Sequence, residues 1–177
     1  MKKIFFLFLF LTGCIHAPKS SFQLNENENI YTMKVNQIEI ISMTSHFDSS
    51  NHIEKEMSLS PEEAVEKWVQ KHLKVETGND KLYVIIHQAE MLRDEKINDS
   101  WFKLDEETYT LNYQLEIQLR QNNSILKSSF AKGKGFITLA KKASLSKKEE
   151  SWAWLIQKML THFEAKITTD FEDAFVR

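Results

Sequence analysis

Apolar and polar residues alternate over residues 108–120, TYTLNYQLEIQLR, more strictly than anywhere else in the chain. Successive side chains of a strand point to opposite faces, so this pattern predicts a strand with one dry face and one wet face. The dry positions are Tyr109, Leu111, Tyr113, Leu115, Ile117 and Leu119, and the wet positions are Thr110, Asn112, Gln114, Glu116, Gln118 and Arg120.

Three further segments predict strands. Residues 34–45 and 81–92 are rich in Ile and Val, and the second is apolar on both faces at first, which is typical of a central strand. In the first, the apolar register slips between Ile40 and Ile41 and predicts a bulge. A polar turn at 121–124 leads into a fourth strand, 125–139, whose small inner residues would let a helix approach. Its expected inner positions are Ile125, Ser129, Ala131, Gly133, Gly135, Ile137 and Leu139.

Two segments repeat their apolar residues with the period of an amphipathic helix. In SPEEAVEKWVQKHLK, residues 60–74, Ser60 and Glu63 match a capping box and Pro61 takes the first helical position. Ser146 and Glu149 predict a second capping box before SWAWLIQKMLTHFEAKI, residues 151–167. The predicted apolar stripes are Ala64, Val65, Trp68, Val69, His72 and Leu73 in the first helix and Trp152, Leu155, Ile156, Met159, Leu160, Phe163 and Ile167 in the second.

These elements predict a single α+β domain over residues 34–177 with the order β-α-β-β-β-α. The wet face of the third strand indicates that the sheet is covered on one side only. We therefore expect a two-layer sandwich, in which a four-stranded, mostly antiparallel sheet carries both helices on one face.

The chain begins with MKK and an apolar run of about eight residues, far shorter than the roughly twenty of a membrane-spanning helix, which predicts a secretory signal. The run ends in LTGC, and Cys14 is the only cysteine in the chain. These four residues resemble the lipobox of bacterial lipoproteins, which implies a signal peptide over residues 1–13, cleavage before Cys14 and lipidation of Cys14. The alternatives are an ordinary signal peptide that contains a cysteine and a cytosolic start with a buried thiol.

A lipidated Cys14 would hold the protein permanently at a membrane. Ile15 is not the aspartate that retains lipoproteins in the inner membrane of well-studied enterobacteria, so the resemblance implies the periplasmic face of the outer membrane. Residues 14–33 are mostly polar and aperiodic and predict a flexible tether, from which the domain can reach a partner near the membrane.

Charge and motifs narrow the possible functions. The chain has 23 basic and 25 acidic residues, and loss of Lys2 and Lys3 with the leader leaves 21 basic residues and a net charge near −4. Domains that bind nucleic acids usually carry a basic excess, so we expect no nucleic-acid partner. The sequence has no glycine-rich phosphate loop and no G-x-S-x-G elbow, and its one thiol is assigned to the lipid. We therefore expect no enzyme activity and no cofactor.

A metal site is weighed at one loop. His46 and His52 lie near Asp48 and Glu54, which are residue types that bind metals. Loop histidines among polar residues are more often solvated, so we expect no metal there.

Seven lysines follow one another from residue 127 onward with no acidic residue between them. Lys132 and Lys134 are expected on the wet side of the fourth strand, and with Lys127 they form a candidate site for an anionic glycolipid or an acidic partner. An edge strand that lysines protect against aggregation explains the pattern equally well. The full set is Lys127, Lys132, Lys134, Lys141, Lys142, Lys147 and Lys148.

Three aromatic residues are further candidates for partner binding. Trp101 and Phe102 lie between the second and third strands, where they either fold back on the core as a lid or anchor a partner. Trp154 lies about 200° round its helix from Trp152, opposite the apolar stripe. We expect it to be half-exposed or covered by Phe171 or Phe175, with an interface as the alternative.

A lipobox, a tether and the order β-α-β-β-β-α with one-sided helices resemble the LptE-like lipoproteins, which plug and assist the outer-membrane lipopolysaccharide translocon. The strand TYTLNYQLEIQL and the closing helix are similar in style and position, and SPEEAVEKWVQKHL and WFKLDEETY are similar to segments of small alphaproteobacterial lipoproteins without an assigned role. The resemblance implies a non-enzymatic accessory of envelope assembly with an outer-membrane partner protein. The alternatives are an auxiliary lipoprotein of an ABC-type lipid or solute transporter, a periplasmic binding module and, more weakly, a periplasmic hydrolase.

Overall fold

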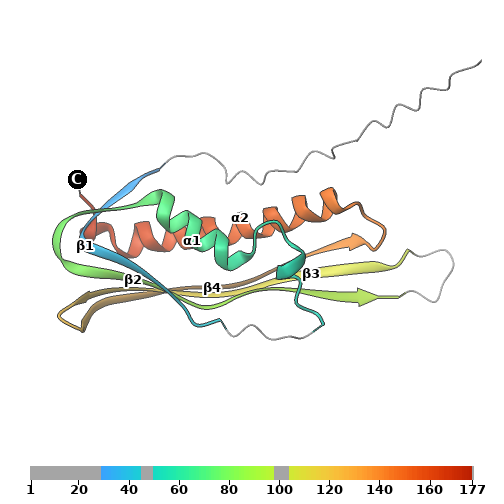
Figure 1. Ribbon diagram of the computed structural model, residues 1–177, viewed down its shortest axis with the longest axis horizontal. Coiled ribbons are helices and arrows are strands. Elements are labelled where there is room, and N and C mark those ends of the chain that lie inside the picture. Colours follow the sequence, from blue (N-terminus) through green and yellow to red (C-terminus); the bar gives the residue numbers. More distant parts are fainter. Residues whose placement is uncertain (1–28, 45–49, 98–103, 177) are drawn as a thin grey trace, which may run out of the picture.

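The computed structural model describes residues 29–44, 50–97 and 104–176. Within these ranges, four strands and two α-helices follow one another in the predicted order, with a short 3₁₀ helix before the first α-helix and another after the second. Both α-helices lie on the same face of the sheet and contact each other (Figure 1). The elements are β1 (Tyr31–Ser42), η1 (Glu54–Glu56), α1 (Pro61–His72), β2 (Leu73–Lys96), β3 (Glu106–Gln121), β4 (Ser124–Ala140), α2 (Leu145–Asp170) and η2 (Glu172–Ala174).

The strands form one sheet in the order β1-β2-β3-β4. β1 and β2 are parallel, because α1 carries the chain back between them, whereas β2, β3 and β4 are joined as antiparallel neighbours. The predicted α+β sandwich, with a mostly antiparallel sheet and two helices on one face, is therefore confirmed. The central position predicted for the second strand is also confirmed.

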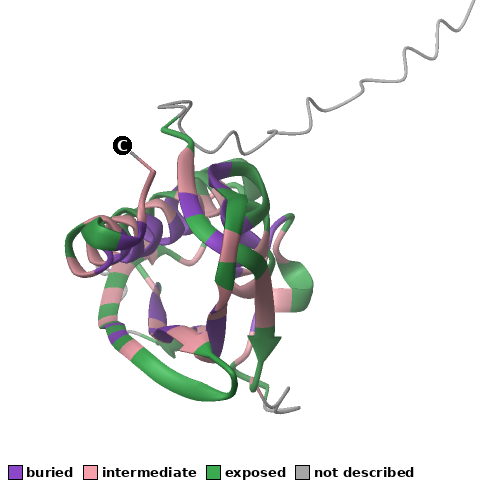
Figure 2. Ribbon diagram, turned by 90° about the vertical axis from the view of Figure 1, so that its left-hand side faces the viewer, coloured by how far each residue is buried: buried purple, intermediate pink, exposed green. Residues whose placement is uncertain are grey.

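The core lies between the helices and the sheet, where Figure 2 shows most of the buried positions. α1 begins as predicted: the hydroxyl of Ser60 accepts a hydrogen bond from the backbone N–H of Glu63, and the carboxylate of Glu63 accepts one from the N–H of Ser60. Trp68 of the predicted stripe stacks on His72 and meets Phe163 of α2 edge-on, with ring centroids 5.1 and 5.3 Å apart. The two helices therefore share one core.

α2 begins earlier than predicted. Its N-cap is Ser144, whose hydroxyl accepts a hydrogen bond from the N–H of Lys147 at 3.3 Å. The turn after β4 closes with a hydrogen bond from Ala143 to Ala140 and leaves Ser144 extended, the conformation that an N-cap needs. Ser146 therefore lies inside the first helical turn, and the capping box predicted there is wrong.

β2 is longer than predicted, because Leu73 both caps α1 and starts the strand. Near its start, β2 approaches β1 so closely that a Cβ on Gly78 would lie 2.4 Å from the carbonyl oxygen of Lys34. The register of β1 against β2 shifts in this region. The bulge predicted at Ile40 and Ile41 is wrong, since both residues pair in regular register with β2.

The hairpin between β3 and β4 turns on Asn122 and Asn123, whose φ angles of 47° and 69° match the two-residue turns that favour asparagine. Just after the turn, β4 shifts register against β3. Ile125, which was predicted to face inward, is therefore 54% exposed, whereas Ser129 and Ala131 face the helices and are buried as predicted.

β1 begins three residues before the predicted domain boundary at residue 34. Met33 is fully buried, and the hydroxyl of Tyr31 donates a hydrogen bond to Glu164 of α2 at 2.5 Å. The predicted tether over residues 14–33 is therefore too long at its end. The predicted signal peptide and Cys14 lie outside the described residues. Neither described α-helix has the length and apolar character of a membrane span.

Candidate binding face

We call the face of the sheet that points away from the helices the open face. The wet positions of β3 lie on it, but three of them are less exposed than predicted: Thr110, Glu116 and Gln118 expose only 7, 8 and 6% of their surface. Around Glu116, His87 of β2 and Ser128 of β4 contact the carboxylate, and Gln118 lies between Glu116 and Arg120 of its own strand. The open face is therefore a packed polar layer in its middle and not a row of solvated side chains.

Glu116 lies at the centre of this polar layer. Its carboxylate accepts hydrogen bonds from Gln118 Nε2 at 2.5 Å, from Ser128 Oγ at 2.8 Å and from His87 Nε2 at 2.8 Å. Burial by itself would raise the pKa of Glu116, but these hydrogen bonds outweigh burial and the pKa is lowered. Arg120, whose guanidinium is hydrogen-bonded to Gln118, extends the layer. Both carboxylate oxygens thus accept hydrogen bonds from protein donors.

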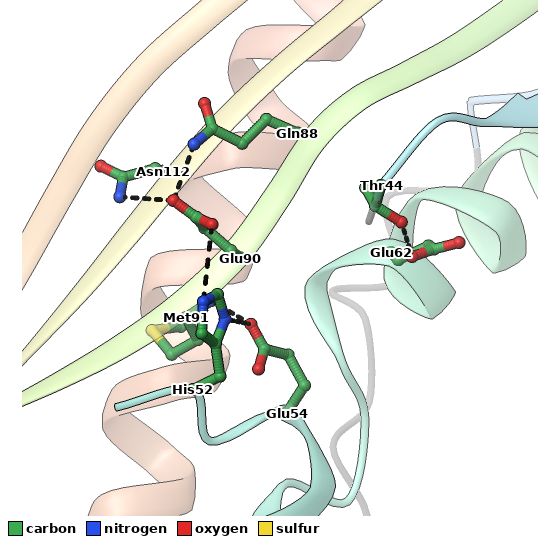
Figure 3. A network of polar contacts seen from close by, with 8 residues as sticks. All are labelled: Thr44, His52, Glu54, Glu62, Gln88, Glu90, Met91 and Asn112. Atoms are coloured by element: carbon green, nitrogen blue, oxygen red, sulfur yellow. Dashed lines mark hydrogen bonds and ion pairs between the residues drawn. The ribbon is translucent and has the colours of Figure 1, made fainter. Parts of the chain in front are cut away.

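A second polar network lies farther along the open face and is drawn in Figure 3. Glu90 accepts hydrogen bonds from the amides of Gln88 at 2.7 Å and Asn112 at 3.0 Å, and its other oxygen is 4.0 Å from His52 Nε2. His52 Nδ1 is 3.3 Å from Glu54, whose carboxylate also accepts the backbone N–H of Met91 at 2.7 Å. The network fastens the chain around η1 to β2.

Two residues of this network, His52 and Glu54, belong to the metal site that was considered from the sequence. Of its four residues, His52 and Glu54 hydrogen-bond to each other and to neighbouring protein groups, and His46 and Asp48 lie outside the described residues. Within the described ranges, no group of three or more His, Cys, Asp and Glu side chains is arranged to hold a metal ion.

The structure separates the lysines of the sequence run. Lys127 lies on the helix side of β4, where its Nζ is 2.8 Å from Asp173 and lies over the ring of Phe171. Lys132 and Lys134 are exposed on the open face, opposite Gln114 and Asn112 of β3. Lys127 therefore does not join Lys132 and Lys134 in one site.

The lysines of this run also differ in whether they form ion pairs. Lys141, Lys147 and Lys148 each have a carboxylate within ion-pair distance: Glu95, Glu150 and Glu107, respectively. In the part of the chain that the structure describes, Lys132 and Lys134 have no such partner. They are thus the two lysines on β4 whose charge is available to a ligand.

Two phenylalanines that were not among the candidates predicted from the sequence flank this pair of lysines. Phe130 and Phe136 share the open face with Lys132 and Lys134 and are 48 and 68% exposed. Phe130 also stacks on His87, with ring centroids 6.2 Å apart. The indication in the sequence was the alternation FAKGKGF, which places all four large side chains on one face of a strand. We call Phe130, Lys132, Lys134 and Phe136 the Phe-Lys row.

Of the remaining aromatic candidates, Trp154 does not join this row. Trp154 is 51% exposed on α2, in the other layer, with Lys158 Nζ 5.5 Å from the centroid of its ring. Phe171 is buried in the core and Phe175 packs against Tyr31, so neither is free to cover Trp154. Trp101 and Phe102 lie outside the described residues.

The Phe-Lys row combines the two properties that an anionic amphiphile requires. Two ammonium groups without a carboxylate partner among the described residues attract phosphate or carboxylate, and aromatic rings at both ends offer apolar surface to a chain or a ring. Exposed large apolar residues that form a patch with charges commonly mark an interaction site. The arrangement supports binding, and it brings no nucleophile and base together.

No protein-family model matches the chain, and no curated protein matches its sequence. The solved structures that match the chain include several bacterial lipoproteins. An uncharacterised lipoprotein B from Nitrosomonas europaea is 15% identical over 82% of this chain and 90% of its own, with a TM-score of 0.43. The minor lipoprotein from Acinetobacter baumannii is 8% identical over 84% of this chain and 98% of its own, with a TM-score of 0.39. The rare lipoprotein B from Shewanella oneidensis is 13% identical over 77% of this chain and 98% of its own, with a TM-score of 0.37.

Proposed function

We propose that this chain is a lipid-anchored accessory protein of a bacterial outer membrane that acts by binding and not by catalysis. The anchor is supported by the sequence LTGC, which ends a short apolar leader on the only cysteine of the chain. Two acyl chains or more on Cys14 hold a protein at a membrane stably, whereas one chain does so only marginally.

The ligand that we propose is an anionic glycolipid, bound during lipopolysaccharide transport or assembly. The observation that carries this proposal is the Phe-Lys row, where two lysines without a carboxylate partner in the described residues stand between two exposed phenylalanines. Phosphate groups of the lipid would meet Lys132 and Lys134, and its apolar part would lie against Phe130 and Phe136. Lys127 is left out of the site because Asp173 already neutralises it.

The test is a titration of the purified protein with lipopolysaccharide at low salt. The double variant Lys132→Glu/Lys134→Glu should bind about tenfold more weakly, which corresponds to roughly 1.4 kcal/mol. The matched control is Lys67→Glu/Lys71→Glu, which makes the same change of charge on exposed positions of α1. Equal affinities of the two double variants, with both still folded, would remove the Phe-Lys row as the lipid site.

The anchor is tested separately by mass spectrometry of the native protein. We expect a chain that begins at Cys14 and carries diacylglycerol and an amide-linked acyl group. An intact leader or an unmodified thiol would contradict the proposed location. Recovery of the lipidated protein from its own membrane, with identification of the proteins that accompany it, distinguishes a lipopolysaccharide translocon from an ABC-type transporter.

A further inference from the structure

The outer edge of β4 is a long row of backbone groups for which the described residues provide no partner. β4 is the last strand of the sheet and pairs only with β3 over its length from Ser124 to Ala140, an edge of about 55 Å. Such an edge presents N–H and C=O groups that another extended chain can use. The opposite edge of the sheet differs, because the C-terminal tail pairs with the start of β1 through Phe175 and Val176.

The composition of β4 is unusual for an edge that is merely protected. Natural edges are blunted by short length, proline, bulges or charges. β4 has 17 residues and no proline, and its register shifts against β3 only near the hairpin. Lys132 and Lys134 do supply charge, but Phe130 and Phe136 are exposed on the same face and favour association. The edge of β4 is therefore open to pairing, but only with a strand whose side chains suit both the lysines and the phenylalanines.

The positions of the lysines disfavour a second copy of this chain paired so that the two Phe-Lys rows lie opposite each other. In an antiparallel self-pairing that sets Phe130 against Phe136 of the other copy, Lys132 must face Lys134 of that copy. Like charges directly opposite each other on neighbouring strands are destabilising, whereas opposite charges there are stabilising. The same two lysines thus favour a strand with acidic side chains at the matching positions.

We propose that the edge of β4 accepts an extended segment of a partner protein as a fifth strand. The segment carries two acidic residues, two positions apart, opposite Lys132 and Lys134, and apolar residues beyond them against Phe130 and Phe136. Backbone hydrogen bonds provide the affinity of such strand addition and the alternate side chains provide its specificity. This inference goes beyond the proposed lipid site, although it uses the same lysines.

The probe is a synthetic nine-residue peptide, Thr-Val-Thr-Glu-Thr-Glu-Thr-Val-Thr, added to the full chain. Its Val and Glu side chains match the Phe-Lys row when the peptide lies antiparallel to β4. We expect a dissociation constant below about 1 mM. Hydrogen exchange should become slower at every second amide of β4, namely at the amides that point away from β3. Lys132→Glu/Lys134→Glu should lose this peptide and gain its counterpart with Lys in place of both Glu residues.

Two N-methylated peptides separate backbone pairing from simple charge attraction. One peptide carries methyl groups on the backbone nitrogens of its Val and Glu residues, and the other carries them on the backbone nitrogens of its Thr residues. Because the N–H groups of a strand point alternately to its two sides, the methyl groups of only one of the two peptides face β4. One methylated peptide should bind as the parent does and the other should not bind. No binding of the parent peptide, equal binding of both methylated peptides, or unchanged amide exchange in β4 at saturation would each overturn the fifth strand.

The two proposals can fail independently. If the wild-type protein does not bind lipopolysaccharide but binds the peptides as expected, only the lipid function is removed. Binding of lipopolysaccharide at the Phe-Lys row, together with any of the three contrary peptide results, removes only the added strand.

Discussion

Glu107 is a charged residue inside the protein, only 4% exposed at the start of β3. One of its oxygens lies 2.5 Å from Lys148 Nζ and 2.5 Å from the hydroxyl of Tyr109. Burial by itself would raise the pKa of Glu107, but the hydrogen bonds from Lys148 and Tyr109 outweigh burial, and the pKa is lowered from its ordinary value of 4.5. The carboxylate therefore stays charged and ties the first turns of α2 to β3.

Replacement of Glu107 by Gln should destabilise the protein in a pH-dependent way. Because the folded pKa is lowered, the stability that Glu107 contributes is fully present above about pH 4.5 and is lost as the pH falls through the folded pKa. We expect Glu107→Gln to lower the free energy of unfolding by about 3 kcal/mol at pH 7, since it leaves Lys148 without its partner. In urea titrations, the difference from the wild type should shrink below pH 4.5. Glu106→Gln, at the exposed neighbouring position, is the control; a difference that stayed constant with pH would contradict the assignment.

At the scale of the elements, the approach of α2 to the sheet depends on a glycine beneath an aromatic ring. Gly133 of β4 pairs with Tyr113 of β3, and a Cβ on Gly133 would lie 2.4 Å from the Tyr113 hydroxyl and 2.6 Å from Cζ. The same hydroxyl is 2.8 Å from Nδ1 of His162 on α2. The ring thus crosses above β4 to reach the helix, and only glycine leaves room for it.

We expect Gly133→Ala to destabilise the protein by about 1–3 kcal/mol, because Tyr113 must move away from both β4 and His162. Gly135→Ala is a matched control two residues along the same strand, where the new Cβ would meet only the side chain of Leu155, at 3.1 Å. Thermal or urea unfolding of the two variants measures the difference. Equal stability of the two would show that the ring of Tyr113 can be displaced at no cost.

The sequence pattern predicted the elements well but predicted less about how their side chains are used. Apolar repeats with periods of two and 3.6 residues were sufficient to predict the order of the elements, the central position of β2 and the placement of both helices on one face. These features depend on which faces of the elements are apolar and become buried, and the repeats record that directly. Lys127 could not be separated from Lys132 and Lys134, since its partner Asp173 is contributed by the tail beyond α2. Phe130 and Phe136 were not predicted as exposed, because large apolar residues usually mark the buried face of a strand, whereas in β4 the buried face carries small residues.

At the scale of the whole molecule, the tail after α2 returns to the start of β1. The N–H of Val176 donates to the carbonyl of Thr32 at 2.9 Å, Phe175 forms a bridge with Met33, and its ring centroid is 5.5 Å from that of Tyr31. Burial and the hydrogen bond to Glu164 raise the pKa of Tyr31 to about 12, so its hydroxyl remains a donor to α2. The tail therefore supports β1 on the edge that β2 does not cover.

Because β1 has only a parallel neighbour, and parallel pairs are slightly less stable per residue, its first residues should depend on this support. We expect Phe175→Ala to lower the free energy of unfolding by about 1–2 kcal/mol, for the loss of a partly buried ring. Hydrogen exchange should accelerate at Tyr31 and Met33, while the amides of β3 keep their protection. Asp173→Ala, which removes a 75% exposed carboxylate from the same tail, is the control and should leave both measurements nearly unchanged. If Phe175→Ala accelerated exchange in β3 as much as in β1, the tail would contribute to global stability and would not be a local support of the first strand.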